Sequence, residues 1–339
     1  MQPFARWLAC ALTTCAMLCG SPGAQAQKLT LMTGGVSKII YMPVTLASRL
    51  GYFRAEGLDV QILSEPAGVD TATELIAGAI QGAVGFYDHT IDLQSRGMDV
   101  QAVVVLGRAA GLAELASTRV AKPMRTIADI AGRKLGVTGF GSSTFFLSRY
   151  LAQQASPAPN DYSITALGPD NGFIDAMVNG TIDAGMVEEP TASRLLRSGA
   201  ARVLVDMRTI EGTRAALGGP YAGACVYAQR KWVSAHPDET KRLVRALVRA
   251  LAYMSTHSPA DIVAQLPPEF VGTDKALYTE ALAATLPSFS RDGRMPEGAP
   301  QTVLKALAAV DPAIVPRHVD LERTYANSFA DEANASLVH

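Results

Sequence analysis

Residues 28–63 read KLTLMTGGVSKIIYMPVTLASRLGYFRAEGLDVQIL, and this stretch decides the fold class. A short apolar strand expected at 28–33 leads through a glycine-rich turn into a helix expected at 38–50. Gly51 ends that helix, because glycine adopts the left-handed conformation of a helix C-terminus at little cost. Residues 58–63 alternate apolar and polar side chains, which is typical of a strand. The stretch therefore predicts a strand–helix–strand unit.

The same alternation continues along the chain and then restarts. The pattern predicts a helix ending at Gly78, a buried strand at 82–86, a helix ending at Gly97 and a strand at 100–106. A second series runs from about 126 to 205. Strands that alternate regularly with helices predict parallel sheets with helices on their faces. We therefore expect an α/β fold with two such units, followed by helices at 240–254, 276–285, 301–309 and 321–330.

The composition excludes several classes of protein. The 339 residues are 48% hydrophobic and carry 30 basic against 31 acidic side chains, a formal net charge of −1. Disordered chains show the opposite balance, with few apolar residues and a high net charge. Nucleic-acid binders usually carry a basic excess, so we expect no nucleic-acid partner.

The first 26 residues have the pattern of a secretory signal. Arg6 supplies the positive charge, residues 7–18 the apolar stretch, and Ala24-Gln25-Ala26 the small-residue cleavage pattern. We therefore expect cleavage after Ala26 and a periplasmic location. Leu18 is bulky for the position before a lipid-modified cysteine at Cys19, which disfavours a lipoprotein. Three of the four cysteines lie in this segment, so cleavage leaves no partner for a disulfide with Cys225.

The sequence lacks the common catalytic and metal-binding patterns. It contains no HExxH, CxxC or GxSxG motif, so we expect no enzyme activity, metal or cofactor. Residues 139–144, GFGSST, follow an expected strand and open an expected helix. The hydroxyl groups and free N–H groups at such a helix start suit a small anion, with Gly141, Ser142, Ser143 and Thr144 in contact. The alternative is an ordinary turn with a serine helix cap.

Polar residues follow other expected strands as well. In open α/β sheets, ligands bind beyond the carboxyl ends of the strands. Each group alone is more often a turn or a helix cap, and only their shared position favours a binding site. The residues in question are Gly34, Gly35, Ser37 and Tyr41 after the first strand, Asp88 and His89 after the third, and Glu189 in the second series.

Three segments carry a family resemblance. Residues 41–60, YMPVTLASRLGYFRAEGLDV, residues 126–137, TIADIAGRKLGV, and residues 179–190, NGTIDAGMVEEP, resemble the NMT1-like solute-binding proteins of ABC transporters for nitrate, sulfonates, taurine and thiamine pyrimidines. The resemblance implies a type II periplasmic-binding-protein fold with two lobes. Lobe 1 would hold residues 27–116 and 216–339, and lobe 2 residues 117–215, with crossings near 112–119 and 216–226.

The resemblance also implies a function and a pocket. The chain would capture a small organic anion by hinge closure, as a monomer, and deliver it to an inner-membrane ABC permease. Four aromatic residues near the polar loops favour an aromatic or short carboxylate: Tyr41, Phe86, Tyr87 and Phe140. The implied lining is Gly34, Gly35, Ser37, Tyr41, Asp88, His89, Gly141, Ser142, Ser143, Thr144 and Glu189, with Arg108 and Tyr221 as further candidates.

Several alternatives remain open at this point. Sulfonates or nitrate are a second ligand class, and pyrimidine precursors a third. Residues 32–35 read MTGG where pyrimidine-precursor binders have a Trp-Thr-Pro-Asn-like opening. A pyrimidine-synthase-like enzyme and a sensor module are the other functions, although the cysteine-rich iron motif of eukaryotic pyrimidine synthases is missing.

Overall fold

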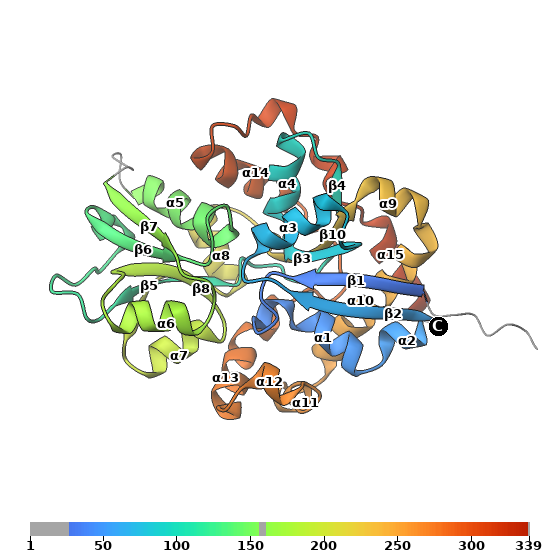
Figure 1. The fold of residues 1–339 in the computed structure, drawn as a ribbon, viewed down its shortest axis with the longest axis horizontal. Coiled ribbons are helices and arrows are strands. Elements are labelled where there is room, and N and C mark those ends of the chain that lie inside the picture. The colour runs from blue at the N-terminus through green and yellow to red at the C-terminus, as the bar shows by residue number, and fades with distance from the viewer. Residues whose placement is uncertain (1–26, 156–160, 338–339) are drawn as a thin grey trace, which may run out of the picture.

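Two lobes lie side by side along the long axis of the molecule (Figure 1). The computed structural model describes residues 27–155 and 161–337. The expected signal segment and its cleavage site after Ala26 lie outside the described residues. Among the helices of the described part, none combines the length and the apolar character that a membrane span requires.

The first lobe is built on a five-stranded sheet with the order β2-β1-β3-β10-β4. Strand β1 runs parallel to β2 and β3, whereas β10 runs antiparallel to β3 and β4. Every residue of β3 and β4 is buried, because helices cover both faces of the sheet. The strands are β1 Gln27–Thr33, β2 Leu58–Ser64, β3 Gly82–Phe86, β4 Val100–Val105 and β10 Ala224–Gln229. The intervening helices are α1 Met42–Arg49, α2 Tyr52–Ala55, α3 Gly68–Ala77 and α4 Asp88–Ser95.

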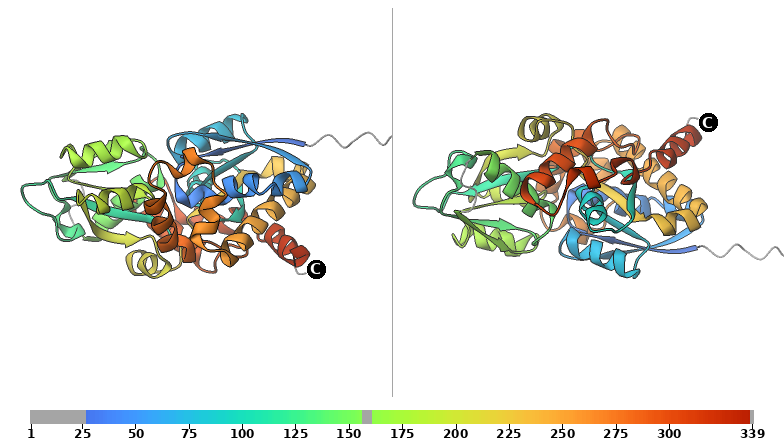
Figure 2. Two further views of the ribbon diagram at one scale, coloured as in Figure 1. Left: turned by 90° about the horizontal axis from the view of Figure 1, so that it is seen from below. Right: turned by 90° about the horizontal axis from the view of Figure 1, so that it is seen from above.

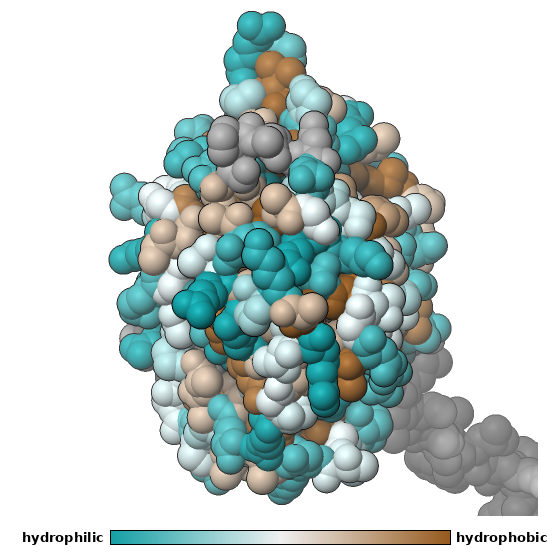
Figure 3. Space-filling model, turned by 90° about the vertical axis from the view of Figure 1, so that its left-hand side faces the viewer, coloured by the Kyte–Doolittle hydropathy of each residue, from teal (hydrophilic) through white to brown (hydrophobic). Residues whose placement is uncertain are grey.

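The second lobe repeats this plan with the order β7-β6-β8-β5-β9. Strand β6 runs parallel to β7 and β8, and β5 runs antiparallel to β8 and β9. The end face of this lobe is largely hydrophilic, as Figure 3 shows. The strands are β5 Leu112–Ser117, β6 Arg133–Val137, β7 Tyr162–Ala166, β8 Ala184–Glu188 and β9 Ala201–Met207, and the helices are α5 Ser143–Ala155, α6 Asn171–Val178, α7 Thr191–Arg197 and α8 Ile210–Leu217.

The chain passes from one sheet to the other twice, at 106–111 and at 218–223. In each sheet the antiparallel strand is the one that follows such a passage, β5 or β10. The expected first crossing near 112–119 lies too late, because residues 112–117 form β5 of the second sheet. Residues 224–226 of the expected second crossing likewise begin β10. We therefore propose these two passages as the lobe boundaries, in place of residues 116 and 216.

The last third of the chain is helical, as expected, and most of it joins the first lobe. The stripe of Leu243, Leu247 and Leu251 on α10 is buried, and Arg245 and Arg249 on the same helix lie 3.5 and 3.6 Å from Glu56. The expected helix at 321–330 is wrong in its bounds, because α15 begins only at Ser328. The helices are α9 Arg230–Ala235, α10 Pro237–Thr256, α11 Pro259–Ala264, α12 Pro268–Val271, α13 Lys275–Thr285, α14 Ala299–Val310 and α15 Ser328–Leu337.

Two of these helices bridge the lobes. Helix α14 packs on α5, and α13 packs on α7, on opposite sides of the junction (Figure 2). At the second contact Arg197 pairs with Asp274 at 3.1 Å and also with Glu280. The two lobes are therefore in contact on both of these sides of the junction.

Candidate functional site

The carboxyl ends of the parallel strands in the two sheets face each other across the junction. Residues at or after the ends of β1, β2 and β3 on one side and of β6 and β8 on the other enclose a small chamber of about 10 Å³. Ligands of open α/β sheets bind at such strand ends. The chamber is lined by Lys38, Tyr41, Gly68, Phe86, His89, Thr138, Ser142, Ser143, Thr144 and Glu188.

A buried ion pair joins the two lobes at the chamber. Lys38 Nζ lies 2.8 Å from Glu188 Oε1, and their side chains are only 5% and 6% exposed. Lys38 follows the turn after β1, and Glu188 is the last residue of β8. The lysine ammonium also lies 5.9 Å from the centre of the Tyr41 ring. Next to this pair, the Ile39 N–H donates to the Glu189 carbonyl oxygen at 2.9 Å.

A second contact across the junction involves a buried carboxyl group. Ser143 Oγ, at the start of α5, donates to Asp88 Oδ1, at the start of α4, at 2.9 Å. Asp88 is fully buried, and its other oxygen, Oδ2, has no hydrogen-bond partner among the described residues. Burial raises the pKa of Asp88 above its ordinary value. Tyr221 lies next to this carboxyl group, and Asp88 is not itself among the residues that line the chamber.

The hydroxyl groups of the GFGSST turn are used mostly within the turn. Ser142 Oγ donates to the Gly139 carbonyl oxygen at 2.7 Å and accepts from the Phe145 N–H at 3.3 Å. The Thr144 hydroxyl accepts from the Thr138 N–H at 3.0 Å. Ser142 therefore caps α5, which was the alternative explanation of this motif. Gly141, with φ of 78°, allows the turn that brings Ser143 alone across the junction.

His89, on α4, lies close to Gly68 at the start of α3, and Gly68 in turn lies close to Gly34 after β1. A Cβ on Gly68 would lie 2.7 Å from His89 Nε2, and a Cβ on Gly34 would lie 2.7 Å from the backbone of Gly68. Close approach therefore requires glycine at 34 and 68. His89 is only 2% exposed and lines the chamber with one part of its surface.

Other expected site residues make contacts around the chamber. Ser37 Oγ donates to Asp170 Oδ2 in the second lobe at 2.6 Å. Gly35, with φ of 110°, shapes the turn between β1 and Lys38. The Glu189 carboxylate accepts from Arg208 at 2.6 Å and from the Ser193 N–H at 2.9 Å. Because Glu189 is paired in this way, its neighbour Glu188 supplies the carboxylate that lines the chamber.

Arg108 and Tyr221 do not line the chamber. The Arg108 side chain is exposed, and its N–H donates to the Ser288 carbonyl oxygen at 2.7 Å. Tyr221 is buried beside Asp88, and burial raises the pKa of the Tyr221 hydroxyl.

The four aromatic residues that the sequence places near the polar loops do not all lie at the chamber. Tyr41 and Phe86 line the chamber with their rings 6.5 Å apart, whereas Tyr87 bonds to Thr324 and Phe140 is 60% exposed.

Sequence reasoning missed four residues of the lining: Lys38, Gly68, Thr138 and Glu188. The Glu188-Glu189 pair was a visible signal, although the pattern did not show which of the two faces the junction. Lys38 directly follows the expected site residue Ser37, but its position after a glycine-rich turn left its orientation undetermined. Over the residues with described placement, no cluster of three or more His, Cys, Asp and Glu side chains could hold a metal ion.

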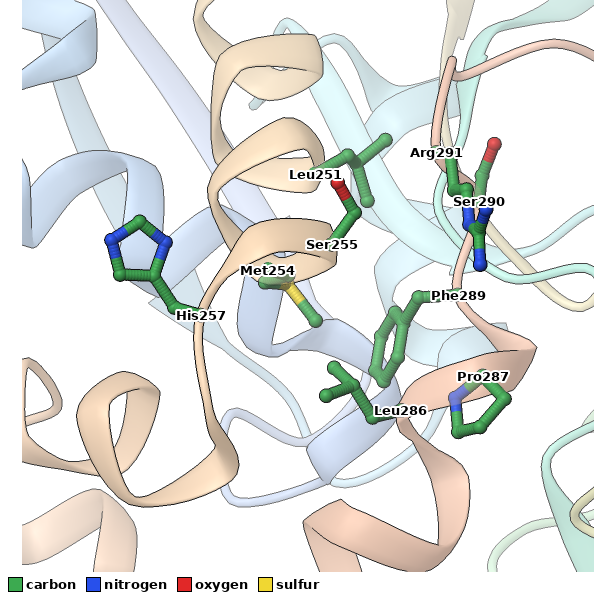
Figure 4. A pocket seen from close by; sticks show the side chains of 9 residues that line it. All are labelled: Leu251, Met254, Ser255, His257, Leu286, Pro287, Phe289, Ser290 and Arg291. Atoms are coloured by element: carbon green, nitrogen blue, oxygen red, sulfur yellow. The ribbon is translucent and has the colours of Figure 1, made fainter.

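A larger cavity of about 190 Å³ lies in the first lobe, between α10 and the turn at Leu286–Ser288. Figure 4 shows its apolar side chains, Leu286 and Phe289 among them, near Met254, with Arg291 farther along. None of the expected site residues lines it. We therefore take the junction chamber as the candidate site.

Two five-stranded lobes that are joined twice and meet at their strand ends define the periplasmic-binding-protein fold. Within that class, the chain matches the family described as NMT1/THI5 like over residues 39–260, and it belongs to that family.

Solved structures and curated relatives agree with this assignment. A protein of Bordetella bronchiseptica RB50 is 31% identical with a TM-score of 0.88, and the match covers 93% of this chain and 99% of that one. The alkanesulfonate-binding protein SsuA from Xanthomonas axonopodis pv. citri, bound to MOPS, is 19% identical with a TM-score of 0.71, covering 88% and 98%.

A curated relative carries the name of an enzyme. The 4-amino-5-hydroxymethyl-2-methylpyrimidine phosphate synthase of Schizosaccharomyces pombe is 28% identical over 230 residues, which are 65% of this chain and 63% of that protein. Less than two thirds of that relative is therefore matched. Since proteins named as binders and as enzymes share this fold, the function must be argued from the site.

Proposed function

We propose that the chain is the solute-binding component of an ABC importer, which holds a small organic molecule between its two lobes and delivers it to an inner-membrane permease. The observation that carries this proposal is the set of polar contacts that span the junction at the strand ends. Lys38 meets Glu188, and Asp88 meets Ser143. A ligand that enters between the lobes replaces these contacts, so that closure and binding are coupled.

The polarity of these groups suggests the chemistry of the ligand. The first lobe presents the Lys38 ammonium and the Asp88 carboxyl group, and the second presents the Glu188 carboxylate and the Ser143 hydroxyl. Each group needs a new partner when the lobes separate, because an unpaired buried polar group is costly. A simple anion satisfies Lys38 and Ser143 but offers nothing to the two carboxyl groups.

The ligand that fits best therefore carries both an acceptor or anionic group and an N–H donor. This refines the expected organic anion, and it includes amino-substituted carboxylates and aminopyrimidines. Nitrate and sulfonates without an N–H group lack the donor and are weaker candidates.

An enzyme is the second candidate function, and the name of the curated relatives supports it. His89, which lines the chamber, and its neighbour Asp88, which bonds to the lining residue Ser143, are the side chains on which a reaction would depend. A binding protein returns its ligand unchanged and binds it in a one-to-one ratio, whereas an enzyme converts it. A sensor module would also bind without turnover, and capture by its permease in membranes distinguishes transport from sensing.

A ligand screen tests the proposal on the chain that begins at Gln27, refolded to remove any bound compound. The panel contains benzoate, butanoate, methanesulfonate and nitrate as simple anions, and phenylalanine, 4-aminobenzoate and 4-amino-5-hydroxymethyl-2-methylpyrimidine as compounds with both groups. At about 100 times its Kd, a ligand stabilises the fold by about 2.7 kcal/mol, enough for a clear rise in Tm. We expect the second group to bind one to one and to be recovered unchanged. Binding only of simple anions would contradict the ligand chemistry, and turnover would contradict the transport function.

A further inference from the structure

An apolar pocket of about 390 Å³ lies beside the chamber, between α3, α4 and the start of α5. Its volume falls in the range of about 300–1,000 Å³ that is usual for small-molecule sites. The lining is mostly apolar, and Asp92 and Arg96, the charged pair among the lining residues, bond to each other at 2.9 Å. The lining residues are Val69, Ala72, Thr73, Ile76, His89, Asp92, Leu93, Arg96, Met98, Gly141 and Phe146.

His89 lies between this side pocket and the chamber. It lines both cavities, and it is the residue that they share. Like the chamber, the side pocket lies across the junction, because Val69 and Leu93 come from the first lobe and Phe146 from the second. A molecule held in the chamber therefore has an apolar space next to it that opens and closes with the same lobe movement.

We propose that the side pocket holds the apolar part, of the size of one or two rings, of the ligand whose polar groups occupy the chamber. This inference rests on the proposed function and extends it, because it assigns an amphipathic rather than a wholly polar ligand. Met98, which lines the pocket, is 40% exposed, and Phe140, next to the lining residue Gly141, is 60% exposed. Such exposed apolar side chains around a pocket are typical of binding sites for apolar groups.

The side pocket can be tested by itself with indole, a ring compound that carries no charge. Thr73 is exposed at the pocket on α3, so Thr73→Trp fills the space without entering the core. Ala77 is exposed on the same helix and does not line the pocket, so Ala77→Trp is the matched control. We expect saturable indole binding by NMR to the wild type and the control, and binding at least about tenfold weaker to Thr73→Trp. Equal binding to all three, or no saturation with the wild type, would overturn the proposal.

A second pair of probes separates this proposal from the proposed function. Phenylalanine and alanine share their charged groups and differ by a phenyl ring, so we expect phenylalanine to bind the wild type at least about tenfold more tightly. Thr73→Trp should remove this gain and leave alanine binding unchanged. If indole binds as expected and neither amino acid does, the side pocket stands and the proposed polar ligand chemistry is wrong. If phenylalanine binds no better than alanine, the side pocket does not serve the ligand.

Discussion

Asp88 has one carboxyl oxygen bonded to Ser143 in the other lobe and one buried oxygen without a partner among the described residues. Burial raises the pKa of Asp88, so the folded protein favours the protonated form of this carboxyl group. The free energy of unfolding therefore falls as the pH rises toward the pKa of the folded state. A ligand donor directed at Oδ2 removes this cost. Asp88 is therefore the residue through which ligand chemistry and fold stability are most directly coupled.

The Asp88→Asn variant separates these two effects. Asparagine keeps an oxygen for Ser143 but presents an amide N–H₂ in place of the unpaired oxygen. We expect ligands with an N–H donor to bind about tenfold more weakly, because a carboxylate acceptor contributes about 1.5–3 kcal/mol at most. The Tm without ligand should not fall. Calorimetric titration and thermal unfolding measure the two quantities, and a large fall in Tm with unchanged affinity would make Asp88 a structural residue.

Glu114 in β5 is a second buried carboxyl group, and it does not line the chamber. Ser148 donates to it at 2.7 Å, and burial raises its pKa to about 8 from 4.5. Between these values the folded protein holds a proton that the unfolded chain releases, so stability falls as the pH rises, by at most about 1.4 kcal/mol per pH unit. Glu114→Gln should flatten this dependence in urea unfolding at several pH values. An unchanged slope in the variant would show that Glu114 does not carry it.

At the residue scale, the sequence pattern indicates which strand ends meet at the junction but not the direction of every side chain. Asp88, His89 and Ser143 lie close together at the junction, and their strand ends are visible in the sequence pattern. Arg108 is exposed instead, since a position just after a strand does not determine whether a long side chain points into the junction or into solvent. Glu188 was passed over for Glu189, because one residue decides which way a side chain leaves a strand end.

At the scale of elements, the two neighbouring serines at the start of α5 make different kinds of contact. Ser142 caps the helix, and Ser143 reaches the other lobe. The sequence shows a run of hydroxyl residues but not this division, which depends on the positive φ of Gly141.

A pair of variants tests the cap. Ser142→Ala removes the side-chain acceptor of the Phe145 N–H and should lower the free energy of unfolding by about 1 kcal/mol. Ser142→Gly is the control. It should lower the free energy of unfolding by only a few tenths of 1 kcal/mol, because glycine is tolerated at the first position of a helix cap. Urea unfolding measures both. If Ser142→Ala keeps full stability but loses ligand affinity, the hydroxyl contacts the ligand and the cap assignment is wrong.

The repeated strand–helix pattern correctly predicted most elements, and its failures have physical causes. Strand β5 was missed because it follows another strand directly across a lobe passage, so the alternation with a helix is absent there. The expected helix at 321–330 arose from Leu321, Tyr325 and Phe329, which are spaced like one helix face. In the structure all three pack against the core of the first lobe, although the chain from 321 to 327 is not an α-helix.

For the molecule as a whole, contacts at the junction connect the two lobes. Helices α13 and α14 contact the second lobe on opposite sides of the junction. This placement of the C-terminal helices was invisible in the sequence, because it depends on packing between helices far apart in the chain, α7 Thr191–Arg197 with α13 Lys275–Thr285 and α5 Ser143–Ala155 with α14 Ala299–Val310. We propose that the lobes rotate about the two short passages at 106–111 and 218–223.

The Lys38–Glu188 pair provides a test of this arrangement. Glu188→Gln leaves the Lys38 ammonium buried without its counter-charge, so the open form should gain population. Lys38→Met combined with Glu188→Leu removes both charges and should restore closure. Small-angle X-ray scattering should show a larger radius of gyration for the single variant than for the wild type and the double variant. Identical radii for all three would mean that this pair does not control the junction.

Movement of the lobes on binding is the central claim, and a distance between the two sheets measures it most directly. Asp59 on β2 and Ser163 on β7 are exposed residues on the outer strands of the two sheets, and Cys225 is buried. Spin labels at Asp59→Cys and Ser163→Cys report the separation of the lobes by pulsed electron resonance. With the panel compound that binds, we predict that a broad distribution of distances becomes a single, shorter one. A distribution that stays the same at saturating ligand would contradict closure between the lobes.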